Sequence, residues 1–140
     1  MIEVSLVPAE YVDTCWEKIE KFIDKAAKYT YGRYTVGNIY DLIKEGDYQL
    51  WVAYDKGIFK GAVVTNVMNY PQKKVLCMQF CGGEELKLWK EPMLDILKRF
   101  ARDSGCEGIE STGRPGWAKV FQNDGYRATW VTYELPIERE

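Results

Sequence analysis

The chain has 140 residues, of which 46% are hydrophobic, and it carries a formal net charge of −2 with no histidine. This size and composition predict one globular domain with a substantial core, and they argue against a disordered chain. Without histidine, neither a Cys/His zinc site nor a His-based catalytic triad can form. The chain also lacks a long apolar run and a block of basic residues. We therefore expect no membrane span and no nucleic-acid groove.

The cysteines give no indication of a metal site or of secretion. There are four of them, at Cys15, Cys77, Cys81 and Cys106, and none forms a Cys-x-x-Cys pair. We interpret them as small core residues and expect no metal. The N-terminus has neither the charged region nor the apolar region of a signal peptide. Reduced thiols and a cytoplasmic location are the resulting expectation.

The first third of the chain predicts a strand followed by two helices. Residues 2–7 alternate apolar and polar side chains, which is typical of a strand. Pro8 suits the first turn of a helix, and apolar residues recur at helical spacing from there to about position 28. After an aromatic loop at 29–34, Thr35 is placed to cap a second helix that ends near Gly46.

Three strands are expected in the middle of the chain, at residues 48–54, 58–67 and 75–80. The turn Asp55-Lys56-Gly57 separates the first two, and the break Asn69-Tyr70-Pro71 precedes the third. The third strand is a nearly continuous apolar run, which indicates a central strand covered on both faces.

The last part of the chain predicts helix, strand, helix and strand. A helix with Pro92 near its start is expected to end at Gly105, and residues 108–111 read as a short strand. A short helix is expected at 115–123. Residues 126–135 alternate in character and predict a last strand, followed by a frayed end.

These elements define a topology. A crossover between parallel strands is right-handed, so the strands at 75–80 and 108–111 should be parallel neighbours. The hairpins before them imply antiparallel pairing. The prediction is a single α/β domain over residues 1–140, with a mixed central sheet of about six strands flanked by about four helices.

Tryptophan placement gives a further expectation about the surface. We expect Trp89, which lies between Lys87 and Lys90, to be exposed and to mark a contact surface. The other tryptophans are expected in or beside the core; they are Trp16, Trp51, Trp117 and Trp130.

The order of elements resembles that of the GNAT N-acetyltransferases over nearly the whole chain. Three segments carry the resemblance: the strand and glycine turn at 75–83, the amphipathic helix that ends at Gly105, and residues 117–126. The last of these is similar to the family's final helix, which closes with a glycine and an aromatic residue, here Gly125 and Tyr126.

The resemblance implies a site for acetyl-CoA after the central strand. In that family, backbone N–H groups of the strand and of the following helix start hold the cofactor and its pyrophosphate. The family pattern is Gln or Arg, two residues, Gly, any residue, then Gly or Ala. Its first half is matched here, with Glu84 in the place of the last small residue. The implied cofactor-binding residues are Met78, Gln79, Phe80, Cys81, Gly82 and Gly83.

The resemblance also implies where the chemistry would occur. Many members use a tyrosine four residues before the glycine that closes the last helix, and this chain has Phe121 there. The family's base is often a glutamate acting through water, for which Glu110 is the candidate. Tyr31 and Tyr34 lie where members bind the acceptor, so they are candidate contacts for a small-molecule or protein amine.

A second reading keeps the fold without catalysis. Glu84 and Phe121 depart from the family pattern, and the run Gly113-Arg114-Pro115-Gly116-Trp117 resembles one found in GNAT-like proteins of tailed bacteriophages. That likeness implies a binding module or a phage structural or assembly component, with phage structural proteins as partners and a virion location. Both readings stay open at the level of sequence, since a fold by itself does not fix a function.

Overall fold

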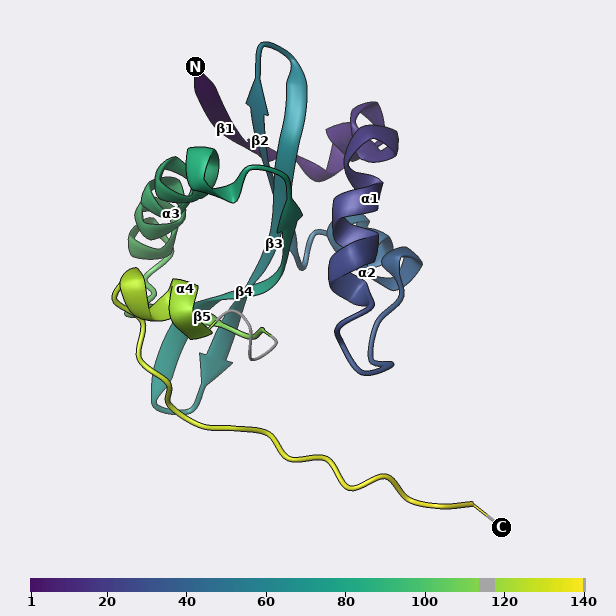
Figure 1. Cartoon of the computed structure of the whole chain (residues 1–140). Coiled ribbons are helices and arrows are strands. Elements are labelled where there is room, and N and C mark those ends of the chain that lie inside the picture. Colours follow the sequence, from purple (N-terminus) through teal and green to yellow (C-terminus); the bar gives the residue numbers. More distant parts are fainter. Residues whose placement is uncertain (114–117, 140) are drawn as a thin grey trace.

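Five strands form one mixed sheet (Figure 1). The computed structural model describes residues 1–113 and 118–139, without the side chains of residues 118, 119 and 121. The strands lie side by side in the order of the sequence; they are β1 (Ile2–Val7), β2 (Gln49–Asp55), β3 (Ile58–Tyr70), β4 (Lys73–Gly83) and β5 (Gly108–Ser111). The first four pair antiparallel, and β4 pairs with β5 in parallel. The predicted mixed α/β sheet and its parallel crossover are confirmed.

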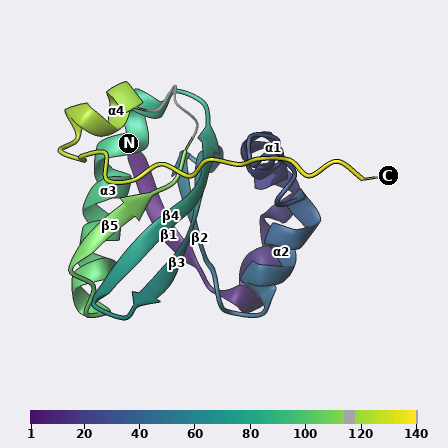
Figure 2. The same ribbon diagram turned by 90° about the horizontal axis from the view of Figure 1, so that it is seen from below.

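The helices cover both faces of this sheet (Figures 1 and 2). Alternate residues of a strand point to opposite faces, so β2 supplies Leu50 and Val52 to one core and Trp51 and Ala53 to the other. The first core packs under α1 and α2, and the second packs under α3. The helices are η1, a 3-10 turn (Ala9–Thr14), α1 (Trp16–Ala27), α2 (Val36–Lys44), α3 (Leu86–Asp103) and α4 (Ala118–Asn123).

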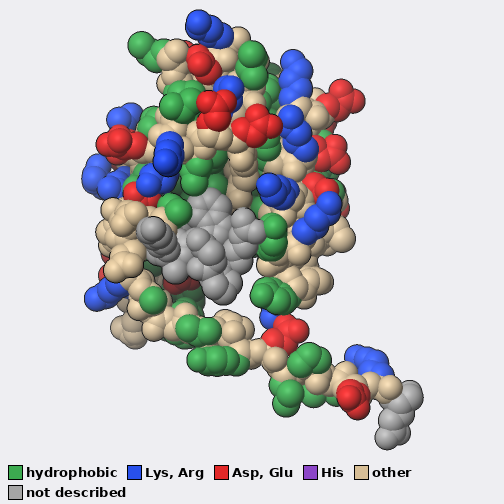
Figure 3. Space-filling model, viewed as in Figure 1, with side chains coloured by type: hydrophobic (Ala, Val, Ile, Leu, Met, Phe, Trp, Pro, Cys, Tyr) green, Lys and Arg blue, Asp and Glu red, His purple; other side chains and the backbone are tan. Residues whose placement is uncertain are grey.

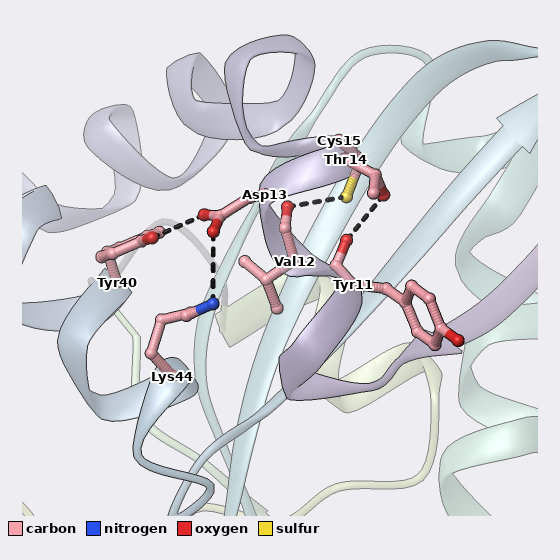
Figure 4. Close-up of polar contacts among 7 residues, drawn as sticks. All are labelled: Tyr11, Val12, Asp13, Thr14, Cys15, Tyr40 and Lys44. Atoms are coloured by element: carbon pink, nitrogen blue, oxygen red, sulfur yellow. Dashed lines mark hydrogen bonds and ion pairs between the residues drawn. The ribbon is translucent and has the colours of Figure 1, made fainter.

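The predicted cap of α2 is confirmed. The amide of Asn38 donates to the Thr35 hydroxyl at 3.1 Å, and the Asn38 side chain accepts from the amide of Thr35 at 2.9 Å. This capping box satisfies two backbone donors at the helix start. Between α2 and η1, the Asp13 carboxylate accepts from the Tyr40 hydroxyl and from the Lys44 ammonium (Figure 4). These hydrogen bonds lower the pKa of Asp13 and tie the 3-10 turn to α2.

The predicted start of α3 is wrong. The helix begins at Leu86, so Pro92 lies inside it rather than near its first turn. A proline there removes one helical hydrogen bond. The helix persists because its buried face, from Trp89 through Met93 and Leu97, packs on the sheet, and packing supplies most helical stability in proteins. The loop between β4 and α3 is correspondingly short.

The predicted last strand is also wrong, so the sheet has five strands rather than six. Residues 127–139, which we call the C-terminal arm, pair with no strand among the described residues. Trp130, expected near the core, is 77% exposed. Its ring meets Tyr70 edge-on at 6.4 Å between centroids, and Glu134 of the arm accepts from Arg33. Within the described chain, no helix combines the length and the hydropathy needed to cross a bilayer.

Candidate functional site

The candidate site begins where the two parallel strands stop pairing. The β4–β5 ladder ends with Met78 opposite Ser111. β4 then runs on to Gly83, still paired with β3 on its other side. Beyond Met78, the side of β4 that faced β5 has no strand beside it among the described residues. A strand edge of this kind presents unpaired backbone N–H and C=O groups.

A bulge in β4 lies at the same point. In the β3–β4 ladder, Val64 is opposite Phe80 but Thr65 is opposite Met78, which leaves Gln79 as an extra residue. A bulge bends the strand that carries it and changes its twist. The end of β4–β5 pairing and the bend of β4 therefore coincide, as expected where two parallel strands diverge.

The β4 side chains in this region are already occupied by the protein core. Met78 and Cys81 pack on the α3 side, and Phe80 packs on the α1–α2 side. The amide group of Gln79 donates to the Asn66 side-chain oxygen at 2.9 Å. What this half of β4 offers to a ligand is therefore its backbone edge.

The two predicted cradle glycines are required by close packing within the chain. A Cβ atom on Gly82 would lie 2.3 Å from the carbonyl oxygen of Phe22 in α1. A Cβ atom on Gly83 would lie 2.5 Å from the carbonyl oxygen of Lys60 in β3. Both distances are shorter than real contacts, so no other residue fits either position without a shift. The two glycines thus allow the backbone of β4 to pack closely against α1 and β3.

Backbone donors suited to an anion follow at the start of α3. The amide of Glu84 donates to the Lys60 carbonyl at 2.7 Å, and the Glu85 carboxylate accepts from the Lys60 ammonium at 2.9 Å. This hydrogen bond raises the pKa of Lys60 and turns Glu85 toward β3. The first N–H groups of a helix have no partner within it and favour anions. The amides of Leu86 and Lys87 are therefore the candidate phosphate donors.

Trp89 is buried, contrary to the expectation that it is exposed. Its relative exposure is 1%, and its indole N–H donates to the Glu84 carbonyl at 2.9 Å. The ring lies over Gly61 of β3. The signal was present in the sequence, because Trp89, Met93 and Leu97 recur at a spacing of four residues, which places them on one helix face.

Glu110 lies in β5 on the face away from α3. Its neighbour Ile109 packs in the α3-side core, so alternation turns Glu110 toward the α1–α2 side. The Tyr70 hydroxyl donates to the Glu110 carboxylate at 2.7 Å and has its pKa raised to about 12 by that bond. Beside it, burial, followed by the Glu110 charge, raises the pKa of Cys77 to about 11. Sequence reasoning missed Tyr70, since no local pattern joins residues 40 positions apart.

The two candidate acceptor residues have different environments. Tyr34 is half-buried and meets Phe80 of β4 edge-on, with 5.1 Å between ring centroids. Tyr48 lies close to Tyr34, and burial raises its pKa to about 12. Tyr31, in contrast, is 76% exposed in the loop before α2. The structure therefore brings Tyr34 to the divergent half of β4 and leaves Tyr31 at the surface.

Space beside the divergent strand is limited. A cavity of about 40 Å³ lies between β4, α3 and α4, where Lys90 of α3 forms an ion pair with Asp124 at 3.0 Å. A nucleotide-sized ligand needs several hundred Å³. A larger groove, of about 350 Å³, lies between the second half of α3, β5 and the turn after α4. The donor groups suit an acyl-CoA, but the ion pair holds α4 close to α3.

Some predicted residues fall outside what the structure describes. These are four of the five residues of the run at 113–117, Trp117 among them, together with the side chain of Phe121. The phage resemblance rests on that run, and the comparisons below lend it no support.

Solved structures share this architecture at low sequence identity. A ribosomal-protein-alanine N-acetyltransferase from Brucella melitensis biovar Abortus 2308 matches with a TM-score of 0.75 at 12% identity, over 98% of this chain and 100% of that one. An aminoglycoside acetyltransferase from an uncultured soil metagenomic sample matches with a TM-score of 0.74 at 12% identity, over 99% of each chain. The chain has the GNAT fold.

One of the matching structures was solved with acetyl-CoA bound. A predicted acetyltransferase from Clostridium acetobutylicum, solved with acetyl-CoA, matches with a TM-score of 0.69 at 12% identity, over 97% of this chain and 96% of that one. No family model and no curated protein sequence matches the chain. At this identity the likeness establishes the fold, and the activity has to be argued from the site.

Proposed function

We propose that the chain is an acyl-CoA-dependent N-acyltransferase that transfers an acetyl group to an amine on a small molecule or a protein. The observation that carries the proposal is the divergence of β4 from β5 at the Gln79 bulge, directly before the start of α3. An unpaired strand edge followed by a helix N-terminus offers amide donors to both ends of an extended phosphate-bearing cofactor. The shared fold of acetyltransferases supports it.

In this proposal the backbone of β4 and the first turn of α3 hold the cofactor. The β4 edge from Met78 to Cys81 binds the amide-containing arm of acyl-CoA, and the segment from Gly82 to the first turn of α3 binds the pyrophosphate. Acyl-CoA supplies the acyl group as a thioester. Because the cavity is small, binding requires α4 to move away from α3 and break the ion pair between Lys90 and Asp124.

Glu110 is the proposed base, and Tyr70 positions it. Glu110 takes the proton that the acceptor amine loses, directly or through one water, while the new C–N bond forms. The C–S bond of the thioester breaks in the same transfer, and the thiolate of CoA leaves and takes a proton from water, since Phe121 has none to donate. The 2.7 Å hydrogen bond from Tyr70 fixes the carboxylate on the α1–α2 side of the sheet. Tyr34 contributes an aromatic wall for the acceptor on that side, and Tyr31 lies at its exposed rim.

Thermal unfolding with and without millimolar acetyl-CoA tests the cofactor part of the proposal. A ligand at 100 times its dissociation constant stabilises a protein by about 2.7 kcal/mol, which raises the melting temperature by several degrees at this size. Lys87→Glu, in the first turn of α3, should reduce the shift by repelling the pyrophosphate. Lys18→Glu makes the same change in the first turn of α1 and should leave the shift intact. Gly82 is unsuitable for substitution, because a side chain there collides with α1.

A binding module without catalysis is the alternative, favoured by the small cavity and by the two carboxylates Glu84 and Glu85 before α3. The same thermal-unfolding measurement decides between the enzyme and the binding module. If no acyl-CoA shifts the melting temperature of the parent, the enzyme proposal is wrong. If Glu84→Gln binds acetyl-CoA and the parent does not, the parent has lost its cofactor site and the alternative holds.

A further inference from the structure

A half-buried ion pair closes the apolar cavity between α3 and α4. Lys90 of α3 and Asp124, the residue after α4, meet at 3.0 Å, and their side chains are 33% and 17% exposed. Among the described residues that line the cavity, these are the two with charged side chains. The rest of the lining includes Met78, Cys81 and Leu86. A charge at the wall of an apolar cavity needs a partner, because an unpaired charge there would be costly.

Lys90 lies about one helical turn from the proposed phosphate site. It follows Leu86, the first residue of α3, by four positions, so the two side chains share a helix face and stand about 6 Å apart along the axis. Both side chains line the cavity. Lys87, in contrast, is exposed. The flexible four-carbon stem of a lysine is long enough to span such a turn, so Lys90 can serve the first turn of α3 from the cavity side.

The charges around the start of α3 favour a cation at this place. A phosphate bound there would lie near the carboxylates of Glu84 and Glu85, which precede the helix. The Lys60 ammonium is already paired with Glu85 at 2.9 Å. α3 itself carries five basic and three acidic residues, and Figure 3 shows Lys and Arg side chains gathered over it, at the left of the view. Among the described basic residues of α3, Lys90 is the one that lines the cavity.

We propose that Lys90 binds a phosphate of the acyl-CoA, and that Asp124 occupies Lys90 when the cofactor is absent. This inference rests on the proposed function. When α4 moves away from α3, Lys90 exchanges the Asp124 carboxylate for a phosphate and so has an anionic partner in both states. The ion pair is therefore a latch on α4, and Asp124 competes with the cofactor for Lys90. Such competition lowers the apparent affinity by the fraction of molecules that are open.

Two substitutions that break the same ion pair test the proposal, because they should affect binding differently. Asp124→Asn removes the competitor and leaves Lys90 for the phosphate, whereas Lys90→Gln removes the phosphate ligand as well as the latch. We expect Asp124→Asn to bind acetyl-CoA about 5- to 10-fold more tightly than the parent does, and at least about 10-fold more tightly than Lys90→Gln does. Calorimetric titration measures the three affinities. Equal affinities of the two variants would overturn the role of Lys90.

The double variant separates this exchange from direct repulsion of the cofactor by Asp124. In a chain that already carries Lys90→Gln, the further change Asp124→Asn should give no gain in affinity, because Asp124 then holds no cation. A gain in that background would mean that Asp124 repels the cofactor directly, and the proposed exchange would be wrong. Lys28→Gln is the matched control, since it breaks the exposed 3.4 Å ion pair with Asp24 in α1 and should leave the affinity unchanged.

Amide hydrogen exchange without any ligand tests the latch by itself. The amide of Asp124 donates to the Val120 carbonyl at 3.3 Å, at the end of α4. We expect the amides of α4 to exchange faster in Asp124→Asn and in Lys90→Gln than in the parent or in Lys28→Gln, because either of the first two loses the ion pair. Unchanged exchange in both would refute the latch. Failure of the proposed function gives a different result, in which none of these chains binds acetyl-CoA, Asp124→Asn included.

Discussion

The indole ring of Trp89 in α3 lies directly against Gly61 in β3. A Cβ atom at Gly61 would be 2.3 Å from Cζ2 of Trp89, closer than any real contact. The same indole donates to the carbonyl of Glu84, the residue that follows β4. One side chain thus fixes the first turn of α3 against two strands, and with it the amides that we propose to bind a phosphate.

Gly61→Ala should destabilise the fold by about 1–3 kcal/mol, because the added methyl group forces Trp89 out of its position. Gly108→Ala is the matched control in another strand, since a Cβ atom there meets nothing within 4 Å. The free energy of unfolding in urea measures both. If the two variants unfold at the same urea concentration, the close packing of Trp89 on Gly61 is not a constraint.

The hydrogen bond between Tyr70 and Glu110 predicts a loss of stability at high pH. Tyr70 has a pKa of about 12 in the folded chain, against about 10 for a free tyrosine. The folded state therefore holds the proton of Tyr70 more tightly than the unfolded state does. The contribution of this hydrogen bond to the free energy of unfolding is complete below pH 10 and is lost as the pH rises toward 12. Ultraviolet titration of the tyrosines should show that Tyr70 ionises at a lower pH in Glu110→Gln than in the parent. Glu107→Gln removes a nearby exposed carboxylate and should not change that titration.

Glu110→Gln should lower kcat of acetyl transfer about 10²–10⁴-fold, the usual contribution of a general base, with little change in the KM for acetyl-CoA. Tyr70→Phe should cause a smaller loss and alter the pH dependence of kcat, since it removes only the group that orients the base. Steady-state rates over a pH series measure both effects. The choice of Glu110 would be wrong if Glu110→Gln kept the rate of the parent on an acceptor that the parent acetylates.

Thiol reactivity provides an independent check of the packing. Burial raises the pKa of Cys15, Cys77 and Cys81, with values of about 11 and about 12 for the last two. A thiol with a raised pKa stays protonated and unreactive at pH 8. Mass spectrometry after brief alkylation of the native chain should therefore find Cys106 modified well before the other three. Equal modification of all four would contradict the described cores.

Local patterns in the sequence account for much of the architecture. Residues 2–7 and 108–111 form strands with the predicted bounds, and Thr35 caps α2 as predicted. These features depend on side-chain alternation or on contacts within one turn, both of which are readable from neighbouring residues. The parallel pairing of β4 and β5 could also be predicted from the order of strand, helix and strand, because the handedness of such a crossover is fixed by the chirality of the chain.

By itself, therefore, the sequence determined the type and order of most elements and the resemblance of that order to the GNAT acetyltransferases. Only the tertiary structure decided that α3 starts before Pro92, that Gly82 and Gly83 are seated against other backbone segments, and that Tyr70 holds Glu110. It also decided that residues 127–135, which have the pattern of a strand, pair with no strand in the part of the chain that the structure describes. A strand exists only where another strand accepts its hydrogen bonds, and contacts between distant residues are set by how the layers pack. Neither condition can be read from local spacing.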